Sequence, residues 1–121
     1  MSRYEFGIMD TAPEKGVRYD EYDPESFRRL VSVTDDYFEP YIHLLKGRLY
    51  LHTLDIESDT IEWTGINLIP PETCKEFAEI LRTAPSELSP DTPEGISEIW
   101  ELKNLLKEAY NEQKFIKLFG I

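Results

Sequence analysis

Alternating apolar residues near the start of the chain indicate a β-strand. Over residues 3–9, Tyr4, Phe6 and Ile8 occupy every second position, the period that places side chains on one face of a strand. Residues 27–33 carry the β-branched content of a second strand. The residues between these two stretches hold two prolines and a glycine among charged residues, which is typical of a loop.

Two further alternating stretches predict a hairpin. Residues 49–54 and 60–68 carry Tyr, Trp, Ile and Thr, which favour strands. The connection between them, residues 55–59, is short and polar, so we expect an antiparallel hairpin at the centre of the sheet. Residues 114–119 are rich in apolar side chains and predict a final strand that closes the sheet.

A helix is predicted from Asp35 to about Lys46. Asp35 suits the N-cap position, and the acidic residues beside it favour the positive end of a helix dipole. Gly47 suits the C-terminal stop, and Pro40 falls in about the first turn, where a missing N–H costs little. The apolar stripe of this helix is expected at Tyr37, Tyr41, Leu44 and Leu45.

Apolar residues at helical spacing predict two further helices. One opens at Glu72 after two prolines and ends before Pro85, and the other spans about Glu94 to Glu112. The core-facing residues expected in the first are Cys74, Phe77, Ala78 and Leu81. Those expected in the second are Ile99, Leu102, Leu106 and Ala109, flanked by Trp100, Leu105 and Tyr110.

The order of these elements, β-β-α-β-β-α-α-β, predicts an α+β fold. We expect a mostly antiparallel sheet of four to five strands with about three helices packed against it. No repeat or linker divides the 121 residues, so we expect a single globular domain over residues 1–121.

The charge of the chain argues against several function classes. There are 24 acidic and 13 basic residues, a formal net charge of −11. Such a chain is repelled by phosphate backbones and anionic lipids, so we expect neither nucleic acid nor a membrane as a partner. With one cysteine and no apolar signal segment among the first residues, we expect a cytoplasmic protein.

Cys74, His52 and Trp63 come nearest to a catalytic or ligand-binding group. A nucleophilic cysteine needs a base within hydrogen-bond reach and surroundings that lower its pKa. Cys74 also lies on an apolar helix face, where a buried structural thiol is the more common role. A small enzyme or ligand-binding domain with a pocket near these three residues is the alternative hypothesis.

Acidic residues between the predicted hairpin strands suggest a calcium loop but lack its full pattern. Asp55, Glu57 and Asp59 match alternate ligand positions of an EF-hand. Thr60 stands where that loop needs glycine, and Ile66 stands where it needs glutamate. We therefore expect a solvated turn there, and we expect no metal or other cofactor.

The most informative feature for function is an acidic, tyrosine-rich stretch between Tyr19 and Tyr41. Tyrosine is enriched at interface hot spots, and acidic patches speed association with basic proteins. Helix capping and core packing account in part for the later residues of the stretch, whereas segment 19–23 has no such explanation. The candidate partner-binding residues are Tyr19, Asp20, Glu21, Tyr22, Asp23, Asp35, Asp36 and Glu39.

In size, charge and this stretch, the chain resembles the small acidic immunity proteins of bacterial toxin–immunity systems. Such proteins are single cytoplasmic domains that bind and block one cognate toxin, often a basic nuclease. The resemblance implies a non-enzymatic inhibitor of a basic partner protein, and it assigns no residue because immunity proteins share no single fold. A homodimer, formed through a sheet edge or through the helix that carries Trp100, is a further alternative.

Overall fold

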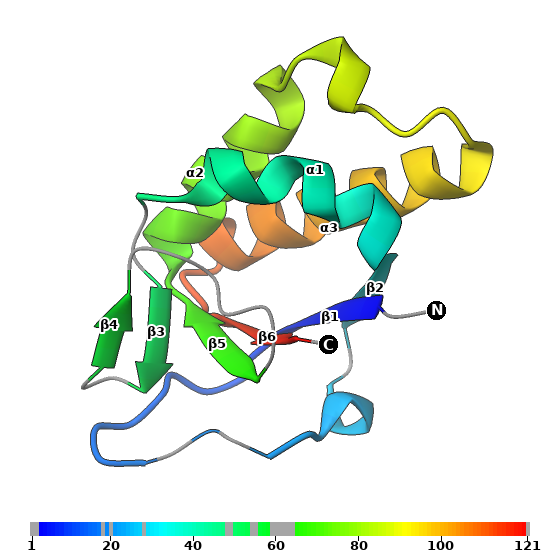
Figure 1. The fold of residues 1–121 in the computed structure, drawn as a ribbon. Coiled ribbons are helices and arrows are strands. Elements are labelled where there is room, and N and C mark those ends of the chain that lie inside the picture. Colours follow the sequence, from blue (N-terminus) through cyan, green and yellow to red (C-terminus); the bar gives the residue numbers. More distant parts are fainter. Residues whose placement is uncertain are drawn as a thin grey trace.

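The fold is built on an antiparallel sheet whose six described strands have the spatial order β2-β1-β6-β5-β3-β4 (Figure 1). Their bounds are β1 Arg3–Ile8, β2 Leu30–Thr34, β3 Tyr50–Thr53, β4 Ile56–Ser58, β5 Ile66–Ile69 and β6 Ile116–Phe119. The computed structural model describes residues 3–17, 19, 21–27, 29–47, 50–53, 56–58 and 65–120. Within these residues, each strand runs antiparallel to the strands beside it.

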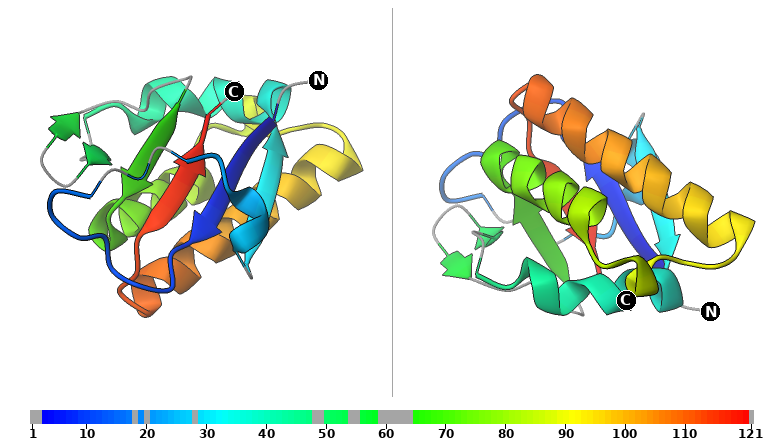
Figure 2. Two further views of the ribbon diagram at one scale, coloured as in Figure 1. Left: turned by 90° about the horizontal axis from the view of Figure 1, so that it is seen from below. Right: turned by 90° about the horizontal axis from the view of Figure 1, so that it is seen from above.

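Three helices cover one face of this sheet. They are α1 Asp35–Leu45, α2 Pro71–Thr83 and α3 Pro93–Asn111, and the connections contain the short 3-10 turns η1 Pro24–Ser26 and η2 Ser86–Leu88. The helices lie behind the sheet in the left view of Figure 2 and in front of it in the right view, while the β1–β2 connection crosses the opposite face. The predicted α+β fold, with a mostly antiparallel sheet and about three helices, is confirmed.

The sheet has one strand more than expected and a different centre. Ile56–Ser58, predicted to belong to a polar connection, forms β4 and pairs with β3. β3 pairs on its other side with β5, and residues 59–64 lie outside the described part of the chain. The two stretches predicted to form a hairpin do pair antiparallel, as β3 and β5. Their expected place at the centre of the sheet is wrong, because β1, β6 and β5 form the middle and β3 lies next to the edge strand β4. Local alternation identifies strands, but pairing between distant strands decides their order.

The core-facing sides of α2 and α3 match the sequence pattern. All of the residues predicted to face the core from these two helices are buried. Apolar residues recur about once per turn, so one side of each helix is buried against the core while the other side carries charged residues. Among the flanking residues, Leu105 is buried, whereas Trp100 is 59% exposed.

The core face of α1 is centred one residue away from the predicted stripe. Its buried residues are Phe38, Tyr41, Ile42 and Leu45. Tyr37 and Leu44, which the predicted stripe contained, are half-buried. Thr34 occupies the N-cap position and Asp35 is the first helical residue, so the predicted cap is one position too late. Pro40 lies inside the helix.

Aromatic rings fill the centre of the core between sheet and helices. Phe38 of α1 stacks on Phe77 of α2 with ring centroids 5.9 Å apart. Phe6 of β1 meets both rings edge-on, at 5.4 Å and 6.1 Å. These contacts fix the rotation of α1 about its axis, because a ring at position 38 completes the cluster and the flanking tyrosine stays at its margin.

Candidate functional site

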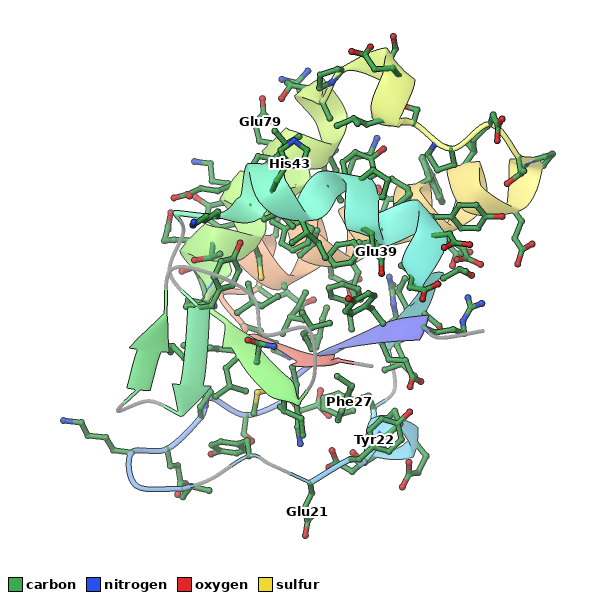
Figure 3. All side chains as sticks on the ribbon, viewed as in Figure 1. Glu21, Tyr22, Phe27, Glu39, His43 and Glu79 are labelled. Carbon is green, nitrogen blue, oxygen red and sulfur yellow. The ribbon has the colours of Figure 1, made fainter. Side chains whose placement is uncertain are left out.

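The β1–β2 connection lies against the sheet face that the helices leave uncovered (Figures 2 and 3). On this face, Met9, Leu51 and Leu68 form a small buried cluster. The partly buried residues packed against it are Tyr19, Phe27 and Phe115. The connection is therefore held to the sheet by its own apolar side chains, which places the described acidic residues 21–23 against the sheet.

Gly7 of β1 makes room for the end of this connection. A Cβ atom at Gly7 would lie 2.7 Å from the Phe27 ring, closer than Cβ atoms come to other atoms in real proteins. The Phe27 ring also meets Phe119 of β6 edge-on, with centroids 5.8 Å apart. The missing side chain at position 7 thus lets the loop lie directly on the strands.

Tyr22 is exposed to solvent and yet fixed in place. Its side chain is 65% exposed, while its ring makes an edge-to-face contact with Phe119, with centroids 5.3 Å apart. Its hydroxyl donates a hydrogen bond to the Glu5 carboxylate of β1, and this bond raises the pKa of Tyr22 above its ordinary value. Most of the side chain is therefore available for contact, and its orientation is set by the sheet.

Asp23 anchors the loop to the middle of the sheet. Its Oδ1 lies 2.8 Å from the Nζ of Lys117 in β6, and only 4% of the Lys117 side chain is exposed. The Ser26 hydroxyl donates to the Asp23 carbonyl at 2.8 Å, which shapes the turn around η1. The buried lysine needs an anionic partner, because an unpaired charge at that depth is costly.

Of the remaining described residues of segment 19–23, Tyr19 supports the loop and Glu21 is exposed to solvent. The Tyr19 hydroxyl accepts a hydrogen bond from the Glu14 backbone N–H at 2.7 Å and so closes the loop on itself. Glu21 is exposed, as is Glu25 in η1. Asp20 lies outside the described residues. The exposed carboxylates and Tyr22 together form an acidic ridge over the sheet, which we call the acidic loop (Glu21–Glu25).

The structure does not bring all of the predicted site residues together. Asp35, Asp36 and Glu39 lie at the start of α1, in the helical layer, whereas the acidic loop lies across the other face of the sheet; Figure 3 shows Glu39 above the sheet and Glu21 below it. Asp35 accepts a hydrogen bond from the Asp36 N–H at 2.8 Å, which supports the first turn of the helix. The predicted stretch therefore forms two acidic areas.

Cys74 belongs to the main core. It is fully buried, and its thiol lies 3.6 Å from the Ile69 carbonyl oxygen. Burial raises the pKa of the Cys74 thiol far above its ordinary value, which disfavours the nucleophilic thiolate. This environment fits the structural role. The side chain of His52 and all of Trp63, the other members of the alternative pocket, lie outside the described part of the chain.

The described residues form neither a metal-binding cluster nor a membrane-spanning helix. Among them, no group of three or more His, Cys, Asp or Glu side chains is placed to hold a metal ion. Asp55 and Asp59 of the calcium interpretation lie outside that part of the chain. Within the same residues, no helix has the length and apolar character needed to cross a bilayer.

A groove between α3 and the edge strand β2 was not predicted. Its volume is about 420 Å³. Its lining residues are Arg29, Leu30, Val31, Trp100, Glu101 and Asn104. We call it the β2–α3 groove. The signal in the sequence was Trp100, a large aromatic residue that lies off the apolar face of its own helix.

No protein-family model, curated protein or solved structure matches this chain. The acidic loop, the β2–α3 groove and the net charge of −11 are the features of the molecule that bear on its function.

Proposed function

We propose that this chain is a non-enzymatic binding protein that neutralises a basic partner protein, in the manner of an immunity-type inhibitor. The observation that carries the proposal is Tyr22, an exposed tyrosine whose ring and hydroxyl are both held by the sheet. Glu21 precedes it and Glu25 follows it, both exposed. A fixed aromatic ring among free carboxylates suits contact with a positively charged protein surface.

The anchoring of the acidic loop supports tight binding. The Asp23–Lys117 ion pair and the packing of Phe27 on β6 order the loop before any partner arrives. A preorganised loop loses little conformational freedom on association, so more of the contact energy appears as affinity. Tyrosine adds to this effect because it gives a large contact area with few rotatable bonds.

The charge of the chain supports a cationic partner. A net charge of −11 steers basic proteins toward it, and steered association reaches rates of about 10⁸–10⁹ M⁻¹s⁻¹ at low salt. A nuclease is such a partner, because its cleft binds phosphates and loop carboxylates would occupy the same positions. A cytoplasmic immunity protein that blocks a cognate toxin nuclease is the specific form of this proposal.

The proposal gives the candidate residues different roles. Glu21 and Tyr22 make direct contact with the partner. Tyr19 and Asp23 hold the loop in shape, since their polar atoms are already engaged within the protein. The acidic residues at the start of α1 lie on the other side of the sheet, so they contribute to long-range steering rather than to the same contact.

Association kinetics test this function. Surface plasmon resonance would measure binding of the product of the adjacent gene, and of purified basic nuclease domains, at about 50 mM and about 300 mM salt. We expect wild-type association to slow strongly at the higher salt concentration, because charge steering is screened. Glu21→Gln with Glu25→Gln is expected to slow association about threefold to tenfold at low salt.

A matched variant separates a local contact from a general charge effect. Glu87→Gln with Asp91→Asn removes the same charge from the exposed connection around η2, which lies on the other side of the molecule from the acidic loop (Figure 1). This variant is expected to associate at close to the wild-type rate. Equal slowing by both double variants, salt-independent binding, or no binding to any of these probes would each overturn the proposed function.

A further inference from the structure

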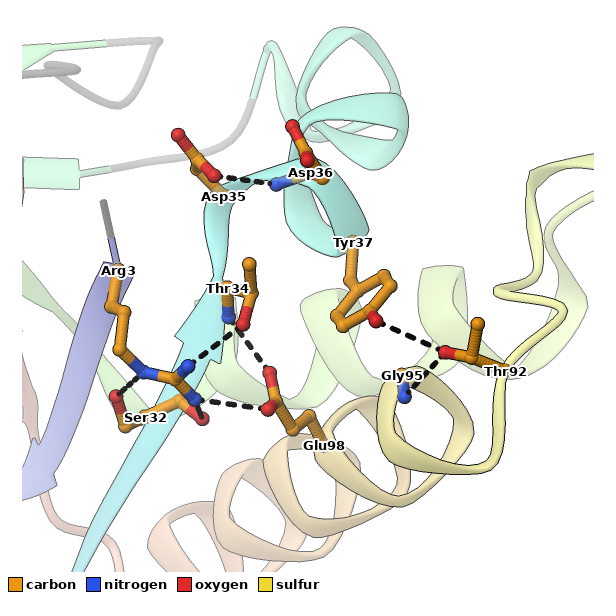
Figure 4. A network of polar contacts seen from close by, with 9 residues as sticks. All are labelled: Arg3, Ser32, Thr34, Asp35, Asp36, Tyr37, Thr92, Gly95 and Glu98. Atoms are coloured by element: carbon orange, nitrogen blue, oxygen red, sulfur yellow. Dashed lines mark hydrogen bonds and ion pairs between the residues drawn. The ribbon is translucent and has the colours of Figure 1, made fainter. Parts of the chain in front are cut away.

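One end of the outer edge of β2 is closed by side chains. In an antiparallel ladder, alternate residues direct both backbone groups away from the neighbouring strand. The N–H of Thr34 donates to the Glu98 carboxylate at 2.8 Å, and so it points away from β1. The carbonyl of Ser32 accepts from Arg3 at 3.1 Å. Arg3 and Glu98 form an ion pair at 2.9 Å across this end of the edge (Figure 4).

The other end of the same edge lies beside the β2–α3 groove. The alternation that turns Ser32 and Thr34 outward turns Leu30 outward as well. Leu30 lines the groove together with Trp100 and Glu101 of α3. An outward-facing backbone pair beside a groove of side chains is the arrangement in which an extended peptide adds to a sheet edge.

Apolar surface is gathered at this groove. Trp100 is 59% exposed, and Ile96, one helical turn earlier, is 55% exposed. The Leu30 side chain alternates with the core-facing Val31 and lies on the sheet face of Gly7, so Leu30 offers its backbone edge to the groove. Single exposed apolar residues are ordinary on protein surfaces, but here Trp100 lines the groove and Ile96 lies one turn from it on the same helix. The groove therefore offers area for a side chain with an apolar stem.

The charges around the groove favour a cation. Arg29 is paired with Glu108 at 3.1 Å, and Arg3 is paired with Glu98. Glu101 has no ion pair within the described part of the chain, so its carboxylate is left to a ligand. Tryptophan is the aromatic side chain that binds a guanidinium most strongly through its ring face.

The net charge also decides between two occupants. A second copy of the chain would bring two molecules of net charge −11 into contact, and like charges at an interface disfavour association. A segment of a basic protein gains from the same field. An arginine fits better than a lysine, since its planar group stacks on an indole and pairs with a carboxylate at once.

We propose that the β2–α3 groove binds an extended, arginine-bearing segment of a basic protein. The arginine stem lies along Trp100, its guanidinium pairs with Glu101, and the segment backbone bonds to the outward-facing backbone groups of Leu30. The inference rests on the proposed function for the class of partner, and it adds a second contact surface on α3, separate from the acidic loop.

A peptide titration followed by NMR tests the groove alone. The probe is acetyl-Val-Arg-Val-Arg-Val-amide, and the control is the same peptide with glutamate in place of arginine. We expect the arginine peptide to shift the Trp100 indole N–H and the Leu30 amide, with a dissociation constant below about 1 mM. Trp100→Ala should weaken binding by about fivefold or more, and Glu101→Gln by about twofold to fivefold.

The controls make each outcome decisive. Trp100→Phe assigns the indole signal and keeps an aromatic wall, so it should bind better than Trp100→Ala. Glu21→Gln with Glu25→Gln should leave peptide binding unchanged, which separates this test from that of the acidic loop. The groove proposal is wrong if neither signal moves, if both peptides act alike, if only the loop variant weakens binding, or if the signals shift with protein concentration alone, as a second copy would cause.

Discussion

Asp23 accepts a hydrogen bond from Lys117 at 2.8 Å, although the two residues are 94 positions apart in the sequence. Lys117 lies in β6, between β1 and β5, and its ammonium also lies 5.1 Å from the centroid of the Phe119 ring. One ion pair thus joins a surface loop to the middle of the sheet. The loop residues that we assign to partner contact depend on it for their position.

Replacing Asp23 by alanine is expected to lower the free energy of unfolding by about 1–3 kcal/mol, because the Lys117 ammonium is left buried without its partner. Urea denaturation measures this change. The double replacement Asp23→Ala with Lys117→Met leaves no buried charge and should recover much of the loss. If the two single losses simply add in the double variant, the two residues are not coupled.

Glu98→Gln is expected to lower the free energy of unfolding by about 1–2 kcal/mol at neutral pH. Burial alone would raise the pKa of Glu98, but the hydrogen bond from Thr34 and the guanidinium of Arg3 outweigh it and hold the pKa below its ordinary value. A carboxyl with a lowered pKa stabilises the fold above its ordinary pKa and loses that effect as pH falls through the folded value.

Unfolding measured from about pH 7 down to about pH 3 checks both parts of this prediction. The wild-type protein should lose more stability on acidification than Glu98→Gln. Glu101→Gln, one position along the same helix from Trp100 and without an ion pair among the described residues, is the control and should follow the wild-type curve. Parallel curves for all three proteins would contradict the role of Glu98.

Tyr4→Phe is expected to keep the stability of the protein or to raise it by up to about 1 kcal/mol, since the buried Tyr4 hydroxyl has no hydrogen-bond partner in the described structure. Burial, with the nearby carboxylates of Glu39 and Asp35, raises the pKa of Tyr4 to about 12. Because the folded protein holds this proton more tightly than the unfolded chain, the free energy of unfolding is unaffected below the ordinary pKa of 10.0. It falls as pH rises from there toward 12.

Thermal unfolding at neutral pH and at about pH 11 tests the Tyr4 prediction. Tyr4→Phe should lose less stability than wild type on the alkaline side. Tyr50→Phe is the matched control, because the buried Tyr50 hydroxyl donates to the Leu45 carbonyl at 2.7 Å. That variant should be less stable than wild type by about 1 kcal/mol. A destabilised Tyr4→Phe would mean that its hydroxyl has a partner.

The Cys74 thiol is expected to react with a disulfide reagent only when the protein unfolds. Its burial and raised pKa leave almost no accessible thiolate in the folded state. The rate of modification by a chromogenic disulfide should therefore rise by orders of magnitude in denaturing urea. Rapid modification of the native protein would revive the alternative in which Cys74, His52 and Trp63 form a ligand pocket.

Local patterns predicted the helices of this protein better than its sheet. The core faces of α2 and α3 follow from helical spacing, because every residue that decides the pattern lies within one element. The strand order follows from pairings such as β1 with β6, whose partners are separated by most of the chain. The rotation of α1 was missed for the same reason, since Phe38 faces inward to meet Phe77 of another helix.

The candidate site was predicted in part. The sequence drew attention to segment 19–23, and the structure gives three of its residues internal partners: Tyr19, Tyr22 and Asp23. The sequence does not predict these partners. Lys117, for example, is an ordinary lysine in a strand, and nothing near it in the sequence indicates that a distant loop will cover it. The β2–α3 groove needed the relative placement of two elements, which no pattern within either one supplies.

The position of β6 has a consequence for how the chain is made. β6 comes last among the described elements along the chain, yet it lies between β1 and β5 in the sheet. During synthesis, the strands on its two sides therefore have no neighbour to join them until residues 116–119 leave the ribosome. Such late, long-range pairing slows folding, so this fold depends on β6 for a complete sheet and for the lysine that anchors the acidic loop.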